Sequence, residues 1–586
     1  MLPGFHPDPS CIFVREWNDT FFCASSSFNA FPGIPVHASK DLQNWKLIGN
    51  VLNREEQLPT LADTNSSTSG IWAPTIRYSN GTFWLVTTLV FDDTRPDNDS
   101  TRWDNILFNS TNPYDPASWS IATHFPFFGY DTSPFWDTDG QAYIVGSHFY
   151  RVYPGLELAP IDLSTGELLE DWQIIWNGAA GAEAPEGPHL YYHPDESNAT
   201  ATTTHDDGGG CYYLLVAEGG TGYGHRVDMA RSRALLGPYD GDPADPELTA
   251  ANTTNYFQTV GHADVFQDAS DNWWGVALST RGGPASDTHP MGRETVLTAV
   301  SWDIANNNST QGSFPIWTPI TGEESVWALP PVDKYIPCGL GPWIDEGDDF
   351  NFPPGSDLPP HFTYYRFPNA SSFAVSPDAG HANTLRLLPS SSNLTGLDGT
   401  SALGGQTFVG RRQQDTLFTY RATLVEYAPT EVGEEAGVTA FLTQDHHLDL
   451  GVVVSPSLSS SSSANESSTG DAEPVLQLRY RGISAVAVPA PVVTPLPDAW
   501  LGKPLVFEIK APNETHFAFS VGLACEDGDG DEEELQTIVY VPNNALSYGF
   551  TGTFLGIYAT SNGGNGTTAA YFSDWRYLPQ GQIRDY

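Results

Sequence analysis

The first half of the 586-residue chain repeats one strand signature five times, and this repeat limits the fold more than any other feature. In each copy, a turn of Asn, Asp or Gly precedes a short run of aromatic and aliphatic residues. The copies begin at Asn18, Asn80, Asp139, Gly210 and Asp271, a spacing of roughly sixty residues. Turn-bounded runs of strand-forming residues at a long period are typical of β-propeller blades, each a small antiparallel sheet. Five copies predict a five-bladed β-propeller; an irregular β-sandwich with chance similarity is the alternative.

Another short strand is predicted upstream of each copy. These strands begin at Asp8, Ala73, Asp131, Glu186 and His262. If this register is right, they are the innermost strands of successive blades, and their first residues surround the central channel at one face. Three carboxylates and one histidine would then converge there. A strand-initial Asp is often only a turn former, and a loop Glu is usually solvated, but the shared repeat position favours a functional site.

The sequence changes character after about residue 345. Residues 348–360 are rich in Asp, Pro and Gly, which is typical of a linker or domain boundary. Beyond them, alternating runs such as residues 437–442 predict an antiparallel β-sandwich of the jelly-roll or lectin-like kind. We therefore predict an all-β chain, with a catalytic five-bladed β-propeller over residues 1–345 and a β-sandwich accessory domain over residues 346–586.

Two segments of the C-terminal part are expected to be loops. Residues 455–468 are almost all serine, which predicts a disordered loop. The acidic run 526–534 superficially resembles a calcium-binding loop, but Glu532 stands where such a loop needs Gly, and Ile538 where it needs Glu. We expect this run to be a solvated loop.

Charge and composition exclude several classes of partner. The formal net charge is −46 and the pI is about 4.3, which argues against binding to nucleic acid or to an anionic membrane. No stretch approaches the roughly 20 apolar residues of a membrane helix. These properties fit a protein that acts on a neutral substrate.

The density of N-x-[ST] sequons indicates the compartment. The chain contains more than a dozen of them, for example at Asn80, Asn252 and Asn393. This density predicts a secreted, extracellular glycoprotein, and because no signal peptide is present we expect a mature or trimmed form. The five cysteines show no CxxC pair and no zinc-binding spacing, so they permit a disulfide or two and predict no metal ligand.

The three repeat-related carboxylates Asp8, Asp131 and Glu186 suit one class of reaction. Hydrolysis of a glycosidic bond needs one carboxylic acid that protonates the leaving oxygen and one carboxylate on the other side of the sugar. When the second group activates water, the two stand about 6.5–9.5 Å apart and the anomeric centre inverts. A third carboxylate nearby raises the pKa of the acid by like-charge repulsion. Position in the repeat leaves open which of the three is base, acid or modulator.

Three other side chains are candidates for substrate binding. Trp72 precedes an innermost strand, and Phe31 follows a nearby turn. Aromatic rings stack on sugar faces, although most aromatic residues of a propeller pack between its blades. Arg293 is suited to holding sugar hydroxyls or orienting a carboxylate; a surface salt bridge is the alternative.

Seven short motifs resemble those of family 43 glycoside hydrolases. They are residues 3–10, 70–75, 129–133, 186–189, 218–225, 261–262 and 292–295. Residues 411–413 and 550–560 are similar to the β-sandwich accessory domain of the xylosidase-like branch of this family, so the resemblance covers nearly the whole chain. It implies that Asp8 is the general base, Glu186 the general acid, and Asp131 the residue that adjusts the pKa of the acid and orients it.

The resemblance also implies a set of binding residues and inversion of configuration. Phe31, Trp72, His262 and Arg293 correspond to positions that, in relatives, line the sugar pocket or the propeller axis. No cofactor is expected to be required. Some relatives hold a calcium ion or a water on the axis near the histidine that corresponds to His262.

Within the family, the chain looks closest to fungal arabinoxylan arabinofuranohydrolases, in tracts such as residues 25–31, 104–106 and 557–566. This implies an exo-acting enzyme that releases α-1,3-linked L-arabinofuranose from doubly substituted xylose units of plant cell-wall arabinoxylan or its oligosaccharides. An exo-acting β-1,4-xylosidase is the nearest alternative. A retaining invertase-like enzyme is disfavoured because its Asn-Asp-Pro-Asn and Arg-Asp-Pro motifs are absent. A non-catalytic carbohydrate-binding lectin is disfavoured because it would not need three converging carboxylates.

Overall fold

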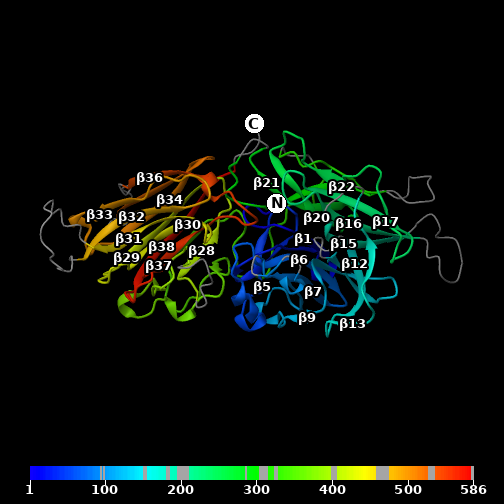
Figure 1. The fold of residues 1–586 in the computed structure, drawn as a ribbon, viewed down its shortest axis with the longest axis horizontal. Helices are drawn as coiled ribbons and strands as arrows, with labels where there is room; N and C mark the ends of the chain where they lie inside the picture. Colours follow the sequence, from blue (N-terminus) through cyan, green and yellow to red (C-terminus); the bar gives the residue numbers. More distant parts are fainter. Residues whose placement is uncertain are drawn as a thin grey trace. The chain divides into compact units, whose positions relative to one another are not determined.

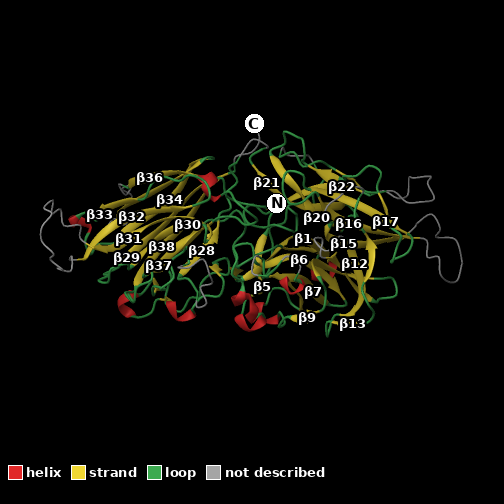
Figure 2. Ribbon diagram, in the orientation of Figure 1, coloured by secondary structure: helices red, strands yellow, loops and turns green. Residues whose placement is uncertain are grey.

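The computed structural model describes residues 1–92, 95–96, 99–148, 155–179, 185–194, 210–283, 287–302, 314–322, 327–396, 405–456, 474–524 and 535–582. Within these residues the secondary structure is almost entirely β-strand (Figure 2), which confirms the all-β prediction. The short 3₁₀ helices are η1 (Arg15–Trp17), η2 (Glu55–Gln57), η3 (Pro59–Asp63), η4 (Ser100–Arg102), η5 (Pro116–Ser118), η7 (Ala370–Ser372), η8 (Ala379–His381), η9 (Asp498–Trp500) and η10 (Asn543–Leu546). No helix in these ranges is long and apolar enough to cross a membrane. Most of the serine run, from residue 457, and the acidic run 526–534 lie outside the described residues.

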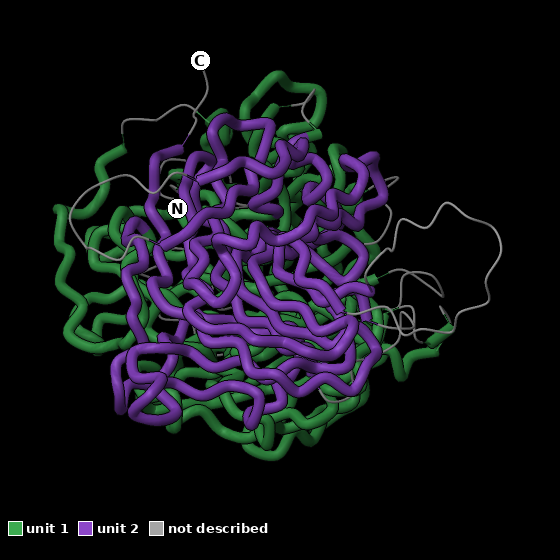
Figure 3. The backbone as a smooth tube through the Cα atoms, turned by 90° about the vertical axis from the view of Figure 1, so that its left-hand side faces the viewer, with its two compact units in different colours: residues 1–287, 293–344, 584–586 green, residues 288–292, 345–583 purple. Residues whose placement is uncertain are grey.

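The chain divides into two compact units (Figure 3). The first comprises residues 1–287 and 293–344, and the second comprises residues 288–292 and 345–583. All the site residues predicted from the sequence therefore belong to the first unit.

The described part of the first unit contains five antiparallel sheets of four or five strands, which follow one another along the chain (Figure 1). The sheets consist of β1 (Ser10–Val14), β2 (Thr20–Ala24), β4 (Gly33–Ser39) and β5 (Lys46–Leu52); β6 (Gly70–Ser79), β7 (Thr82–Val90), β8 (Trp103–Ser110) and β9 (Thr123–Phe125); β10 (Gly129–Trp136), β11 (Ala142–His148), β12 (Leu156–Asp162), β13 (Glu167–Leu168) and β14 (Gln173–Trp176); β15 (Glu186–Pro194), β16 (Gly210–Glu218), β17 (Arg226–Ser232), β18 (Asp240–Gly241) and β19 (Leu248–Thr249); and β20 (Phe257–Gln267), β21 (Trp273–Arg281), β22 (Glu294–Ser301) and β23 (Ile316–Trp317). In each sheet, one of the predicted innermost positions lies within the first strand or, for Asp8, two residues before it.

The five sheets pack on one another in a cycle. Their first strands contact one another in the order β1, β6, β10, β15, β20 and back to β1. Apolar side chains fill the space between neighbouring sheets, for example Val86 and Ile144 between the second and third, and Phe21 and Trp274 between the first and fifth. The N-terminal segment bonds to β22 of the fifth sheet, because Leu2 and Thr295 exchange backbone hydrogen bonds of 3.0 and 3.1 Å. The first residues of the chain thus join the last sheet to the first.

The inner strands share a backbone irregularity at the predicted site positions. Asp8, Ala73, Asp131 and His262 have φ angles of 52, 39, 53 and 47°, in the left-handed region that non-glycine residues rarely adopt. The pairing register shifts around the last three of these residues. Bulges of this kind re-aim side chains, and strained backbone of this kind concentrates at functional sites.

The fourth sheet departs from the predicted alignment by one residue. Its left-handed residue is Gly187, with φ 57°, so Glu186 precedes the position that Asp8 and Asp131 occupy in their strands. A Cβ on Gly187 would lie 2.9 Å from two ring atoms of His262, which leaves no room for a side chain there. The prediction of one shared position is therefore wrong for Glu186: the carboxylate of this strand has to come from a neighbouring residue.

The second unit is a β-sandwich, as predicted. One sheet has the order β26 (Phe373–Val375), β27 (Leu385–Leu387), β38 (Ala570–Gly581), β29 (Leu417–Glu426), β34 (Leu505–Asn513), β35 (His516–Leu523) and β36 (Gln536–Pro542), and β24 (Asp348–Phe350) also pairs with β38. The other has the order β28 (Phe408–Arg412), β37 (Phe554–Thr560), β30 (Glu435–Thr443), β31 (His446–Pro456), β32 (Pro474–Ile483) and β33 (Val492–Pro495). Apolar residues of both sheets, such as Phe507 and Val438, form one shared core.

Candidate active site

The structure brings the three predicted carboxylates together around one histidine. Nδ1 of His262 lies 3.8 Å from Oδ1 of Asp8 and 4.0 Å from Oδ2 of Asp131. The backbone N–H of Gly187, next to Glu186, donates to Oδ2 of Asp131 over 3.1 Å. Asp8 and Asp131 are buried, with 5 % and 6 % of their surface exposed, and Glu186 is half-buried. Residues far apart in the sequence thus form one compact acidic site.

Asp8 is held in its charged form. The hydroxyl of Ser26 donates to Oδ2 of Asp8 over 2.6 Å, and the guanidinium of Arg293 donates to both carboxylate oxygens, over 3.1 and 3.4 Å. Burial alone would raise the pKa of Asp8, but Arg293, His262 and the Ser26 hydroxyl together keep this pKa below its usual value. An ionised carboxylate is the form that can accept a proton from water.

Glu186 is held in its protonated form until near neutral pH. Burial, together with the negative charge of Asp8, raises the pKa of Glu186 to about 7. The hydroxyl of Tyr130 donates to Oε2 over 3.1 Å, and this bond, together with the charge of Arg293, opposes the rise. A protonated carboxyl at this position can donate its proton to a leaving group.

Asp131 is the third member of the site and is coupled to Glu186. Burial and the charges of Glu186 and Asp8 raise the pKa of Asp131 well above its usual value, although the Gly187 N–H favours its ionised form. The charge of Glu186 thus disfavours ionisation of Asp131, and the two carboxyls are not readily ionised together.

His262 lies between the carboxylates as a neutral imidazole. Burial lowers the pKa of His262 despite the nearby charge of Asp8. Among the described residues, no group of three or more His, Cys, Asp or Glu side chains is arranged to hold a metal ion. Calcium takes six to eight oxygen ligands, so the side chains around His262 do not fit a calcium ion that they bind directly.

Arg293 is a buried residue of the site, so the alternative of a surface salt bridge is wrong. Only 6 % of its surface is exposed. In addition to its bonds to Asp8, its Nη1 donates to the hydroxyl of Thr221 over 3.2 Å. Thr221 lies in the motif 218–225, which sequence analysis singled out without assigning a role to the threonine.

A chain of aromatic rings adjoins the carboxylates. Trp72 is among them: its ring centroid lies 5.9 Å from that of Phe28 and 6.2 Å from that of Tyr130. The Phe28 ring lies 5.6 Å from the Arg293 guanidinium. Phe31 is buried in the short strand β3 (Ala30–Phe31).

Four residues of the site are not predicted from the sequence: Ser26, Phe28, Tyr130 and Thr221. Tyr130 directly precedes Asp131, and Ser26 and Phe28 lie in the tract 25–31, so a search of the neighbours of the predicted motifs would have found candidates. Nothing in the spacing of these residues shows which side chain faces a carboxylate.

Two family profiles together match most of the chain. Residues 1–306 match glycosyl hydrolases family 43, and residues 347–578 match the beta xylosidase C-terminal concanavalin A-like domain.

Curated relatives include enzymes with two substrate preferences. A non-reducing end alpha-L-arabinofuranosidase of Bacteroides ovatus is 30 % identical over 98 % of this chain and 93 % of its own length. A beta-xylosidase of Bacillus subtilis is 29 % identical over 76 % of this chain and 77 % of its own length.

Solved structures of similar proteins cover almost the entire chain. A family 43 protein of Bacillus licheniformis has a TM-score of 0.76 and 27 % identity, and covers 99 % of this chain and 98 % of that one. A family 43 protein from a xyloglucan locus of Bacteroides ovatus has a TM-score of 0.75 and 28 % identity, over 98 % and 99 % of the two chains.

Proposed function

The chain belongs to glycosyl hydrolases family 43 and is a glycoside hydrolase; from this premise we propose that it removes terminal α-L-arabinofuranose from arabinoxylan with inversion of configuration. In this proposal Asp8 is the general base, Glu186 the general acid, and Asp131 the residue that raises the pKa of the acid. The opposite directions of the Asp8 and Glu186 pKa shifts, within one buried site, support this assignment most strongly.

The proposed reaction proceeds in a single displacement. Asp8 accepts a proton from a water molecule, whose oxygen forms a bond to the anomeric carbon. Glu186 donates its proton to the glycosidic oxygen as the bond between that oxygen and the anomeric carbon breaks. Asp131 stays beside Glu186, where its carboxylate, when ionised, would favour the protonated acid by charge repulsion. Arg293 and Ser26 orient Asp8 through the bonds described above.

The same proposal assigns the five sheets of the first unit to the blades of a five-bladed β-propeller. The cyclic order of contacts among β1, β6, β10, β15 and β20 supports a closed ring. The acidic site then lies where the inner strands of the first, third and fourth blades begin.

Arabinose is favoured over xylose as the released sugar. The arabinofuranosidase of B. ovatus aligns with 98 % of this chain, whereas the beta-xylosidase of B. subtilis aligns with 76 %. The preference for α-1,3-linked arabinose on doubly substituted xylose rests on the resemblance to fungal arabinoxylan arabinofuranohydrolases. A β-1,4-xylosidase is the second candidate because curated relatives are named beta-xylosidase and putative beta-xylosidase.

We also propose that the protein is secreted and acts on plant cell-wall polysaccharide. The buried disulfide between Cys11 of β1 and Cys23 of β2 supports an oxidising compartment. The net charge of −46 is compatible with a neutral polysaccharide and unfavourable for a polyanion.

A liberated-sugar assay tests the proposed substrate. The protein is incubated separately with wheat-type arabinoxylan and with xylobiose, and the monosaccharides are separated and identified. We expect arabinose from the first and little xylose from either. Xylose as the main product of both would contradict the arabinofuranosidase assignment and favour the second candidate. The isosteric variant Glu186→Gln, which cannot donate a carboxylic proton, is the control for contaminating activities.

A further inference from the structure

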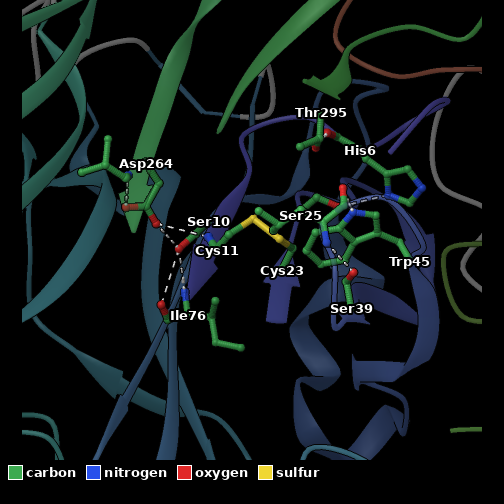
Figure 4. The surroundings of a disulfide bond; sticks show 12 residues. His6, Ser10, Cys11, Cys23, Ser25, Ser39, Trp45, Ile76, Asp264 and Thr295 are labelled. Carbon is green, nitrogen blue, oxygen red and sulfur yellow. Dashed lines mark hydrogen bonds between the residues drawn. A yellow bond between two sulfur atoms is a disulfide. The ribbon is translucent and has the colours of Figure 1, made fainter. Parts of the chain in front are cut away.

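A second carboxylate, Asp264, lies further along the inner strands and joins four of them. It is fully buried and accepts six hydrogen bonds from residues of β1, β6, β15 and β20. We call Asp264 and the side chains of Ser10, Arg77, His189 and Tyr191 the Asp264 cluster. Figure 4 shows part of it, with Asp264 bonded to Ser10 and Cys11 beside the Cys11–Cys23 disulfide.

Both oxygens of Asp264 are saturated with donors. Oδ2 accepts from the Ser10 hydroxyl (2.7 Å), the Cys11 backbone N–H (3.3 Å) and Nη1 of Arg77 (2.8 Å). Oδ1 accepts from Nη2 of Arg77 (3.1 Å), the Tyr191 hydroxyl (2.5 Å) and the backbone N–H of Val265 (2.9 Å). A buried carboxylate with this many partners has one well-defined position.

Each strand that meets Asp264 contains, or directly follows, a residue of the active site or of the aromatic rings beside it. On β1, Ser10 follows Asp8 by two residues, and on β20, Asp264 itself follows His262 by two. The other two strands show the same arrangement over slightly longer distances: β15 contains Tyr191 and Glu186, and β6 contains Arg77 and Trp72. The Asp264 cluster therefore links β1, the strand that follows Asp8, to β15, the strand of Glu186.

Asp264 remains ionised at the pH at which Glu186 loses its proton. Burial alone would raise the pKa of Asp264, but Arg77, with His189 and the hydrogen bonds to Arg77 and Tyr191, holds it far below its usual value. Burial lowers the pKa of His189 to about 3, so its neutral ring can accept from Nη2 of Arg77 at 3.2 Å. A buried ion pair is a poor source of net stability, and its best-attested use is to fix one arrangement among several.

We propose that Asp264, together with Arg77 and Tyr191, is a positioning residue for the hydrolysis, which sets the separation of Asp8 and Glu186 by fixing the strands that hold them. This inference rests on the roles of Asp8 and Glu186 in the proposed function. The separation matters because water has to fit between base and sugar while the acid reaches the leaving oxygen. A displacement of about 1 Å in such a site lowers the rate by as much as about 100-fold.

The variant Tyr191→Phe tests this role with the smallest disturbance. It removes one hydroxyl bond to Asp264 and leaves the Arg77–Asp264 ion pair in place. Tyr239→Phe is the matched control, because Tyr239 is a buried tyrosine of the same unit whose hydroxyl donates to a backbone oxygen, that of Leu235, over 2.9 Å. Both variants lose a tyrosine hydroxyl that donates a hydrogen bond, but only the Tyr191 hydroxyl is bonded to the cluster, where it also accepts from the Val265 N–H over 3.2 Å.

The measurements are kcat, KM, the pH profile of kcat and the midpoint of thermal unfolding, on the glycoside that the wild-type protein hydrolyses best. We expect similar losses of thermal midpoint in both variants. Tyr191→Phe should lower kcat by about 10-fold with KM within about twofold, whereas Tyr239→Phe should keep wild-type kcat. We also expect the alkaline limb of the Tyr191→Phe profile to move to lower pH, because loosened strands separate Glu186 from the charge of Asp8.

Two results would overturn the proposal: wild-type kcat and an unmoved pH profile in Tyr191→Phe, or an equal loss of kcat in Tyr239→Phe. Failure of the proposed function would look different. Release of xylose by the wild-type protein would contradict the assignment of arabinose as the released sugar. Full activity of Glu186→Gln would contradict the assignment of Glu186 as the general acid. Neither result depends on the two tyrosine variants.

Discussion

Two layers of carboxylates lie on the inner strands, Asp131 and Glu186 in the first and Asp264 in the second, and they favour opposite protonation states. In the first layer, Asp131 and Glu186 have few donors, and burial with neighbouring charge raises the pKa of both. In the second layer, Asp264 accepts six hydrogen bonds and is paired with Arg77, so it stays ionised. The difference shows that burial alone does not make a carboxyl reactive. The charged partners and the hydrogen-bond donors around the carboxyl decide whether it holds a proton that can be transferred.

Removing the general acid or the general base should have the largest effect on kcat. Glu186→Gln and Asp8→Asn should each lower kcat by about 10²–10⁴-fold. Asp271→Asn is the control, because the side chain of Asp271 is 80 % exposed in the same unit and should leave kcat unchanged. If either active-site variant kept most of its activity on an unactivated glycoside, the corresponding role would be wrong. The measurement is steady-state release of sugar at the pH optimum of the wild-type protein.

Substitutions in the two layers should differ in their effect on the free energy of unfolding, with the larger loss in the second layer. Asp264→Asn leaves the charge of Arg77 without its buried partner and should lower the free energy of unfolding by about 3–5 kcal/mol. Asp131→Asn resembles the protonated form that its surroundings favour, so this free energy should stay the same or rise. Urea-induced unfolding at neutral pH measures both. Equal destabilisation by the two variants would contradict the distinction between the layers.

The pH dependence should report the proton on Glu186. Because the acid has to be protonated and its pKa is raised to about 7, kcat/KM should fall as the pH rises through about 7. The Tyr130 hydroxyl stabilises the ionised form, so Tyr130→Phe should move this alkaline limb to higher pH. A limb that stays in place, or moves to lower pH, would show that Tyr130 does not act on the acid.

Removal of metal ions should have the smallest effect on kcat. The proposed steps use only side chains of the chain itself, so dialysis against a chelator should leave kcat unchanged. Loss of activity that calcium restores, but magnesium does not, would contradict this expectation. Such a result would indicate an ion held near His262 largely through water.

The strand repeat made much of the site predictable. A turn followed by an aromatic run, repeated along the chain, predicted the first strands of the sheets and brought Asp8, Asp131 and His262 to related positions. The one-residue offset of Glu186 could not be predicted, because it depends on the ring of His262 lying against Gly187, a contact between different sheets.

The second layer could not have been found by spacing at all. Ser10 and Asp264 are 254 residues apart, and Arg77 and Asp264 are 187 apart. Their bonds exist only because the inner strands of different sheets pack side by side, which a single sequence does not show. By contrast, Tyr130 lies next to Asp131 and could have been proposed from adjacency.

The configuration of the first sugar released tests the central claim most directly. The protein is mixed with an α-linked arabinofuranosyl oligosaccharide, and proton NMR follows the anomeric signals before mutarotation. A water activated by Asp8 opposite the proton donor Glu186 predicts β-arabinofuranose as the first product. If α-arabinofuranose appeared first, the reaction would retain configuration, and the roles of Asp8 and Glu186 as base and acid of one displacement would be contradicted.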